Sequence, residues 1–479
     1  MSALVALAKA EAAQSGRAQL VSTVRHVHLA DRPLVLIALT LAGEANAPLA
    51  AMIGDSPGSA RLLVVDQPRN RDQRFAFAAE LAGIVLGHFA STDVPQLLVP
   101  NPATIGFVRL LGRSTRFRRP TGEHAVDPAV PLLGRWLTCY AEQAERPGSC
   151  LLLAATDALA LHWATGQSAV EDLNLAALLG WIDPPPGLTG PQAARAAEDP
   201  LTWPPAGPAT DPTFDNEILA PLISACSNPE ISSRRRELAI TNLHNAIAGQ
   251  LAPTWRLMWR AVELLKSLPP GGHVGRRWDA DRDAFVKYGE HVRDGGPPQP
   301  RRDSAVAAAQ RLSWLEQQQA SYTAQRAFDD PLVLAQYRLT GEAFGGEVIA
   351  AEPDRIDGSG PRRKLRPLIT LVTEDLFRVD VGALVISPTR PSQEARVTSV
   401  TEQPAGSVVE LELSKGMGRS LTAPPGSVPV VGERVCYTTL SDAWQVRGVF
   451  PERENTPWTH GGPPPVYLPT PEDQTEAWS

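Results

Sequence analysis

Cysteine is scarce in this chain of 479 residues, and the few cysteines stand far from one another. Cys139, Cys150, Cys226 and Cys436 form no Cys-x-x-Cys pair and show no spacing typical of a disulfide-stapled domain. This pattern excludes a metal knuckle built from cysteines and a secreted disulfide scaffold. We therefore expect a protein of the reducing cytoplasm.

Long apolar runs are also missing. A membrane helix needs roughly 18 consecutive apolar residues, whereas the best stretch, which begins at Pro33, reaches a charged residue at Glu44. Residues 1–20 lack the basic-then-apolar order of a secretion signal, because Lys9 and Glu11 interrupt it. The sequence thus predicts a cytoplasmic protein without membrane contact.

Motifs that bind nucleotides are absent too. The chain contains no Gly-x-x-x-x-Gly-Lys-Ser/Thr phosphate loop and no Gly-x-Gly-x-x-Gly. Gly54-Asp-Ser56-Pro-Gly58 matches the Gly-x-Ser-x-Gly pattern of a hydrolase nucleophile, but Pro57 has no N–H to stabilise an oxyanion. These absences exclude a recognisable nucleotide-driven motor and favour a non-enzymatic protein.

Positive charge is carried almost entirely by arginine. The net charge is −7, which argues against a protein that coats nucleic acid by bulk electrostatics. Lysine is rare, whereas arginine, alanine and proline are abundant, a bias typical of a GC-rich bacterial genome. Clusters of arginine here are therefore weaker evidence for phosphate binding than they would be in another chain.

The chain contains 45 prolines, and the blocks in which they gather separate three regions of different sequence pattern. Unalternating apolar runs such as 34–41 and 62–65 are typical of buried parallel strands, and helical patterns such as 75–89 separate them. The middle of the chain shows helical spacing, and the last third shows short alternating strands between Gly/Pro turns.

The predicted architecture is a multidomain chain with an N-terminal α/β sheet, a helical middle and a small C-terminal β-barrel, OB-like or SH3-like. The expected parts are an α/β domain over 1–183, a Pro-rich linker or surface strap over 184–213, a helical domain over 214–352, a basic Gly/Pro-rich connector over 353–367, a barrel over 368–450 and a Pro/Trp-containing tail over 451–479.

Polar residues follow the predicted strands of the α/β domain. Glu44, Asp66 and Asn101 come after three successive strands, and open α/β sheets bind ligands along the edge where parallel strands end. Arg69 and Arg71 add two guanidinium groups, and the helix that Asn101 opens would present free N–H groups to an anion. A small-anion-binding sensor is therefore one alternative function.

The same edge supports a second alternative, a metal-dependent hydrolase of nuclease type. Glu44 and Asp66 could hold a divalent ion, the one cofactor that any of our hypotheses requires. His26-Val-His28 would place two imidazoles on one strand face as weak candidate metal ligands. The lysine that usually helps to activate water in such nuclease sites is missing, because no lysine occurs between Lys9 and Lys266.

Basic residues gather at the entrance to the predicted barrel. Arg362, Arg363, Lys364 and Arg366 place four cations within five positions, enough for a few phosphate contacts. Another basic run is Arg116-Phe-Arg118-Arg119. In the order of its elements, the region from about 303 to 450 resembles the helical stalk and small β-barrel that decorate superfamily one helicases. Without the motor's phosphate-binding motifs, the resemblance implies an accessory module that faces nucleic acid.

Two segments are candidate docking sites for a protein partner. One is a short coiled-coil-like seam, although a helical hairpin within the chain explains the same pattern. The seam consists of Ala305, Ala308, Leu312, Leu315, Gln319 and Tyr322. The other is the tail over 451–479, with Trp and Tyr among prolines. The leading hypothesis is a non-enzymatic scaffold or accessory protein, without a cofactor, that assists a nucleic-acid-processing partner.

Overall fold

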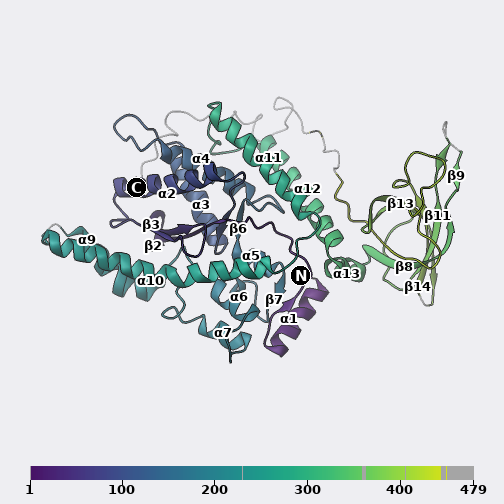
Figure 1. Ribbon diagram of the computed structural model, residues 1–479, viewed down its shortest axis with the longest axis horizontal. Helices are drawn as coiled ribbons and strands as arrows, with labels where there is room; N and C mark the ends of the chain where they lie inside the picture. Colours follow the sequence, from purple (N-terminus) through teal and green to yellow (C-terminus); the bar gives the residue numbers. More distant parts are fainter. Residues whose placement is uncertain (1, 229, 359–362, 405, 444–448, 450–479) are drawn as a thin grey trace, which may run out of the picture. The chain divides into compact units, whose positions relative to one another are not determined.

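The computed structural model describes residues 2–228, 230–358, 363–404, 406–443 and 449 (Figure 1). The chain forms two compact units, and each is described by itself. The sheet unit is drawn from Ala8–Leu20 and Arg25–Leu315, and the barrel unit from Met1–Leu7, Val21–Val24 and Glu316–Val446. The tail expected over 451–479 lies outside the described residues.

A five-stranded sheet of order β4-β3-β2-β5-β6 forms the centre of the sheet unit. Its strands are β2 (Leu34–Leu41), β3 (Glu44–Gly54), β4 (Arg61–Val64), β5 (Leu97–Val99) and β6 (Leu152–Ala154). β2 is parallel to β5 and β5 to β6, whereas β3 is antiparallel to both β2 and β4. β2, β4, β5 and β6 therefore run in one direction, which confirms the predicted α/β sheet.

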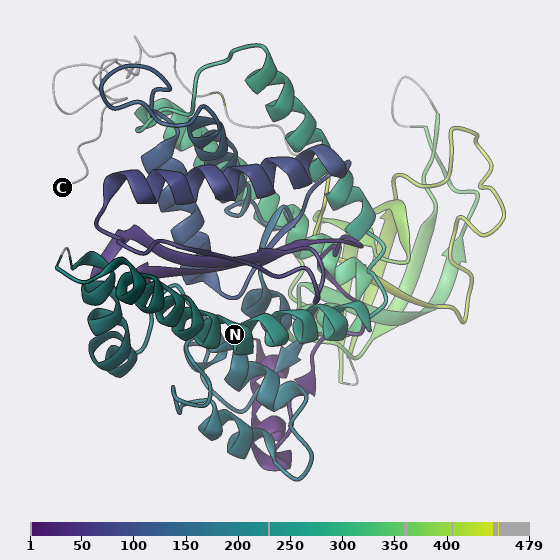
Figure 2. The same cartoon turned by 60° about the vertical axis from the view of Figure 1, so that its left-hand side comes forward.

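Both faces of this sheet are buried, which explains why its strands are apolar throughout. Leu34, Leu36 and Ala38 of β2 belong to one core, and Val35, Ile37 and Leu39 belong to the other. Helices α2 (Arg71–Ser91), α3 (Pro102–Thr115) and α4 (Ala129–Gln143) supply the first core, and α5 (Ala155–Ala160), α6 (Leu175–Ile182) and α10 (Ser233–Lys266) supply the second. Figure 2 shows the sheet between the blue helix α2 and the teal helix α10.

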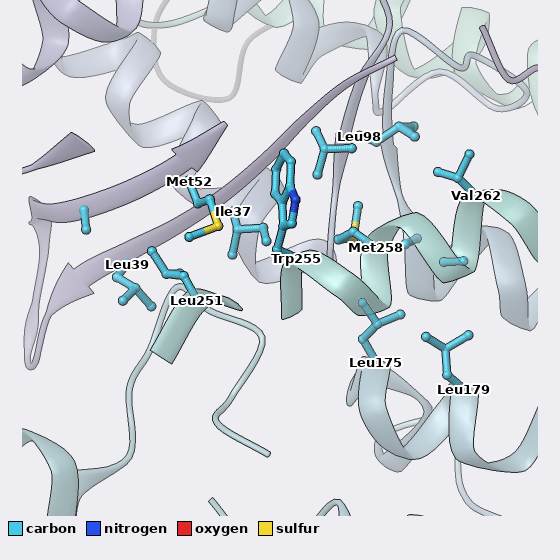
Figure 3. Packing of buried hydrophobic residues seen from close by; sticks show 14 of the residues in the cluster. Ile37, Leu39, Met52, Leu98, Leu175, Leu179, Leu251, Trp255, Met258 and Val262 are labelled. Carbon is cyan, nitrogen blue, oxygen red and sulfur yellow. The ribbon is translucent and has the colours of Figure 1, made fainter. Parts of the chain in front are cut away.

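Helix α10 corrects the expected boundary between the α/β and helical domains. Its buried residues Leu251, Trp255 and Met258 pack in one cluster with Ile37 and Met52 of the sheet (Figure 3). The part of the expected helical domain that forms α10 therefore shares a core with the sheet. Helical periodicity shows that a face must be covered, but it does not show which element covers it.

Further helices and strands belong to the sheet unit. They are β1 (Gln19–Leu20), β7 (Trp163–Ala164), α7 (Gly190–Ala196), α8 (Pro212–Phe214), α9 (Ala220–Ser227) and α11 (Val274–Arg293). Helix α1 (Ala3–Ser15) and helix α12 (Ala305–Asp329) contribute residues to both units.

The Pro-rich block over 184–213 includes a strap packed against strand β2. The carbonyl of Pro208 accepts a hydrogen bond from the Thr40 N–H at 2.9 Å. Gly207 has φ +88°, and a Cβ at this position would collide with the carbonyl oxygen of Ala38. Only glycine fits this left-handed backbone and close approach. The block is therefore a strap with its own helix α7 rather than a free linker.

A closed six-stranded barrel of order β11-β14-β13-β12-β15-β8 forms the centre of the barrel unit, which confirms the predicted barrel. Its strands are β8 (Ala343–Glu352), β11 (Leu368–Thr373), β12 (Leu384–Ser387), β13 (Arg390–Gln403), β14 (Gly406–Leu413) and β15 (Arg434–Thr438). Inward residues alternate along β11, where Ile369 and Leu371 are fully buried. The short strands β9 (Ile356–Asp357) and β10 (Lys364–Leu365) pair within the connector.

The barrel starts earlier than its expected boundary at 368. Strand β8 lies in the segment expected to be helical up to 352, and it closes the barrel by pairing with both β11 and β15. Two glycines obscure the alternating pattern of β8 in the sequence. At one of them, Gly346, a Cβ would collide with the Val372 carbonyl, so the close approach of β11 requires glycine.

Helix α12 carries the predicted seam, whose residues are exposed or half-buried. Leu312, for example, is 59% exposed.

The next helix, α13 (Pro331–Thr340), is capped by Asp330. This fully buried residue accepts hydrogen bonds from the Ser22 hydroxyl at 2.6 Å and the Thr23 N–H at 2.7 Å. None of the described helices has the length and apolar character that a membrane span requires.

Candidate functional site

The carboxyl edge of the sheet gathers the polar residues that the sequence pointed to. Glu44, Asp66 and Asn101 follow the ends of β2, β4 and β5, and Asp157 lies in the first turn of α5, after β6. Because these four strands run in one direction, their ends share one edge of the sheet.

The cations expected at this edge are engaged by the chain itself. Arg69 Nε lies 2.8 Å from Glu44 Oε1. Arg71 donates to Asp72 Oδ1 at 2.9 Å and to the His124 carbonyl at 2.7 Å. Each of the two guanidinium groups therefore has a partner within the chain.

Asn101 is buried, and both the oxygen and the nitrogen of its side-chain amide form hydrogen bonds. Its Oδ1 accepts from the Thr104 N–H at 3.1 Å and so caps helix α3, in which Pro102 has no N–H to offer. Its Nδ2 donates to the Gly207 carbonyl at 3.0 Å, so the strap contacts the residue that caps this helix. Anion binding at this helix end stays a prediction.

Asp66 has a partner that sequence reasoning missed. Its Oδ1 lies 2.8 Å from His244 Nε2, on helix α10. No local signal could reveal this pair, because it depends on α10 packing onto the sheet. Glu44 and Asp66, the two carboxylates of the hydrolase alternative, therefore have different partners.

His26 and His28 do not lie on a strand face, which corrects the expectation for this pair. The segment forms only an isolated bridge at Arg25. The His26 N–H donates to His162 Nε2 at 2.9 Å, and the His28 ring stacks on Trp278 with centroids 4.0 Å apart. Burial lowers the pKa of His28 to about 4. Among the described residues, no group of three or more His, Cys, Asp or Glu side chains could hold a metal ion.

The basic connector is exposed in part. Arg363 and Lys364 are exposed, and Arg362 lies outside the described residues. Arg366 donates to the carbonyls of Leu365 at 3.2 Å and Ser414 at 3.1 Å, so it stabilises the entrance of the barrel.

A cavity of about 170 Å³ in the sheet unit is lined by charged side chains, and we call it the arginine cleft. Its lining consists of Arg109, Arg113, Arg116, Thr138, Ala141, Glu142, Glu145, Pro300, Arg301, Asp303 and Arg311. Five arginines and three acidic residues give the lining a formal charge of +2.

Helix α3 and its C-cap position three of these arginines. Arg109, Arg113 and Arg116 are spaced by four and three residues, which places them on one face of a helix. Helix α4 lies close to this face, because a Cβ at Gly134 would collide with the Arg116 backbone N–H. Arg311 reaches the cleft from α12.

Glu145 bridges two of the arginines. Its Oε1 lies 3.0 Å from Arg109 Nη2, and its Oε2 lies 2.6 Å from Arg311 Nη2. A second carboxylate, that of Asp303, lies 3.8 Å from Arg311 Nη1. Arg113 is exposed and forms no ion pair within the described part of the chain. Arg113 thus offers its donors to an added anion, whereas Arg109 and Arg311 are already paired with Glu145.

Arg116 is a buried arginine in the lining of the cleft. It is only 4% exposed, and it donates to the carbonyls of Gln299 at 2.9 Å and Pro300 at 3.3 Å. Nearby, burial raises the pKa of Glu142, although the positive charges of Arg311 and Arg116 oppose this rise.

Of the cleft, sequence reasoning found only the run that contains Arg116. The helical spacing of Arg109, Arg113 and Arg116 is the signal that could have revealed the rest. Comparisons with known proteins add nothing to this geometry: no family model, curated protein or solved structure matches the chain.

Proposed function

We propose that this protein is a non-enzymatic binding protein whose arginine cleft recognises a small anionic ligand. The observation that carries the proposal is the convergence of five arginines from α3 and its C-cap, α12 and the segment before α12 on one cavity. Guanidinium groups present planar donor pairs that match the oxygens of phosphate and carboxylate groups. The proposed function is the small-anion sensor expected from the sequence, with its binding site in the arginine cleft instead of at the sheet edge.

The size of the cleft supports a small ligand group. Its volume of about 170 Å³ lies below the roughly 300–1,000 Å³ of pockets that enclose drug-sized molecules. A single phosphate or carboxylate group suits this space, with any larger organic part extending into solvent. Among the lining residues, the buried Arg116 is held by two backbone carbonyls before any ligand arrives.

Isothermal titration calorimetry tests this proposal. The full-length protein is titrated with inorganic phosphate, and with chloride at the same ionic strength as the reference. We expect saturable binding of one phosphate and none of chloride. Arg109→Ala should weaken phosphate binding roughly 10–100-fold, the effect of losing one charge-assisted hydrogen bond.

Arg61→Ala is the matched control for this variant. Arg61 pairs on the surface with Glu80 at 3.7 Å, away from the lining of the cleft. It should leave phosphate affinity unchanged. Absence of saturable phosphate binding to the unmodified protein would contradict the proposal.

The barrel supports a second candidate function, contact with nucleic acid as part of an accessory role beside a nucleic-acid-processing protein. Arg363 and Lys364 are exposed at the connector, and no ion pair occupies either of them within the described residues. Two such cations would each release counterions on binding a phosphate backbone.

Fluorescence anisotropy with a labelled single-stranded oligonucleotide tests this second candidate on the full-length protein. The double variant Arg363→Ala/Lys364→Ala should lower the salt slope of the binding constant by about 1.4, which corresponds to two lost contacts. The double variant Arg419→Ala/Arg434→Ala removes two exposed barrel cations elsewhere and should leave the slope unchanged. Equal slopes for all three proteins would contradict the second candidate.

A further inference from the structure

We infer that the Glu145 carboxylate is a built-in occupant of the arginine cleft and that the cleft selects phosphate monoesters, which displace it. This inference rests on the proposed function, because it assumes that the cleft binds an anion. The ligand class is the phosphate monoester, and competition from the Glu145 carboxylate sets its affinity.

Glu145 contacts the arginines as the carboxylate of a ligand would. Each of its two oxygens contacts a different guanidinium group, one on α3 and one on α12. Arg109 and Arg311 therefore share one bridging carboxylate that the chain supplies. Any incoming anion that uses the same donors must replace it.

The position of Glu145 makes this replacement inexpensive. It lies just beyond the end of α4, after the C-cap residue Ala144, so its side chain can turn away without unwinding the helix. Its side chain is 38% exposed, and those of Arg109 and Arg311 are 44% and 34% exposed. Ion pairs with this degree of exposure contribute little to stability.

The competition with Glu145 selects the ligand. An incoming monocarboxylate offers the same charge and the same two oxygens as Glu145. Its binding costs translational freedom, which Glu145 does not lose because it is tethered to the chain. A phosphate monoester carries up to two charges and a third terminal oxygen, and Arg113 stands ready to pair with it. Only the more highly charged group therefore displaces Glu145.

Glu145→Gln removes the competitor's charge and keeps its shape. If Glu145 occupies the two arginines roughly nine-tenths of the time, its removal raises phosphate affinity about tenfold, because apparent affinity scales with the open fraction. The same change should admit acetate, which the unmodified protein excludes. Glu80→Gln removes one exposed surface charge from the sheet unit and serves as the control.

The experiment titrates inorganic phosphate and acetate into full-length unmodified, Glu145→Gln and Glu80→Gln proteins at constant ionic strength. The expected result is tighter phosphate binding and new acetate binding for Glu145→Gln alone. Glu145→Ala repeats the test without the glutamine amide, and equal melting temperatures show that each variant folds.

The outcomes separate this inference from the proposed function. Phosphate binding to the unmodified protein with no gain for Glu145→Gln or Glu145→Ala would overturn the inference and leave the proposed function intact. No phosphate binding to any protein, Glu145→Gln included, would overturn both. Parallel titrations with glucose 6-phosphate and with a 5′-phosphorylated oligonucleotide identify the source of the phosphoryl group, and a gain in either supports the inference.

Discussion

The sheet edge and the arginine cleft are both rich in charged side chains, but they differ in what fills them. At the edge, the strap supplies a carbonyl to Asn101, and Arg69 is paired with Glu44. In the cleft, a cavity of about 170 Å³ remains among five arginines. The carboxyl edge of an α/β sheet is therefore a ligand site only where no other part of the chain already contacts its polar residues.

The largest expected effect concerns the strap, which we regard as a permanent part of the edge. Gly207→Ala adds a Cβ that collides with the Ala38 carbonyl at a backbone with φ +88°. The free energy of unfolding should fall by about 3 kcal/mol, which urea denaturation measures. Gly187 has a similar φ of +83° but nothing within 4 Å, so Gly187→Ala should cost only about 1 kcal/mol. Equal losses would mean that the strap is not held against β2.

A second prediction contrasts the cations of the two regions. Arg311→Ala should weaken phosphate binding roughly 10–100-fold in calorimetric titrations, because it removes a charge-assisted donor of the cleft. Arg69→Ala, at the edge, should leave phosphate affinity unchanged. Both arginines lie in exposed ion pairs, so each change should alter the unfolding free energy by less than about 1 kcal/mol. A loss of phosphate binding in Arg69→Ala would return the anion site to the edge.

A third prediction tests whether Asn101 has only a structural role. Asn101→Ala removes the cap of α3 and the hydrogen bond to Gly207, and it should cost about 2 kcal/mol of stability. Asn70 caps α2 in an exposed position, and Asn70→Ala should cost about 1 kcal/mol. Phosphate affinity should stay the same in both variants. Weaker phosphate binding in Asn101→Ala would contradict this division of roles.

The smallest effect concerns the pH dependence of stability. Burial lowers the pKa of His28 to about 4, whereas the unfolded value is near 6.5. The unfolded state therefore takes up a proton first, and stability that is fully present above pH 6.5 is lost as the pH falls toward 4. Because the ring is half-buried, we expect a loss on the order of 1 kcal/mol.

His28→Phe checks this pH effect. Phenylalanine keeps a ring to stack on Trp278 but cannot take up a proton. Urea denaturation between pH 7 and pH 4.5 should show a shallower fall in unfolding free energy for the variant. Identical pH profiles would place the acid sensitivity elsewhere.

The sequence predicts what depends on local patterns. The apolar run of β2, the cap at Asn101 and the alternation along β11 are each encoded within a few residues, so the sheet, its carboxyl edge and the barrel could be expected. The arginine cleft could not, because Arg109 and Arg311 come from helices far apart in the chain. The strap escaped prediction as a cover for Asn101 for the same reason.

Closure of the barrel has a consequence for the order in which the chain folds during synthesis. Ala343 of β8 pairs with Thr438 of β15. The first barrel strand therefore cannot complete its pairing until the last strand has left the ribosome. At roughly 5–20 residues per second, this delay lasts on the order of 5–20 s. During that time β8 has an unpaired edge, which is open to aggregation until closure removes it. A chain truncated before β15 would therefore keep the unpaired edge of β8, whereas the full-length chain loses it when the barrel closes.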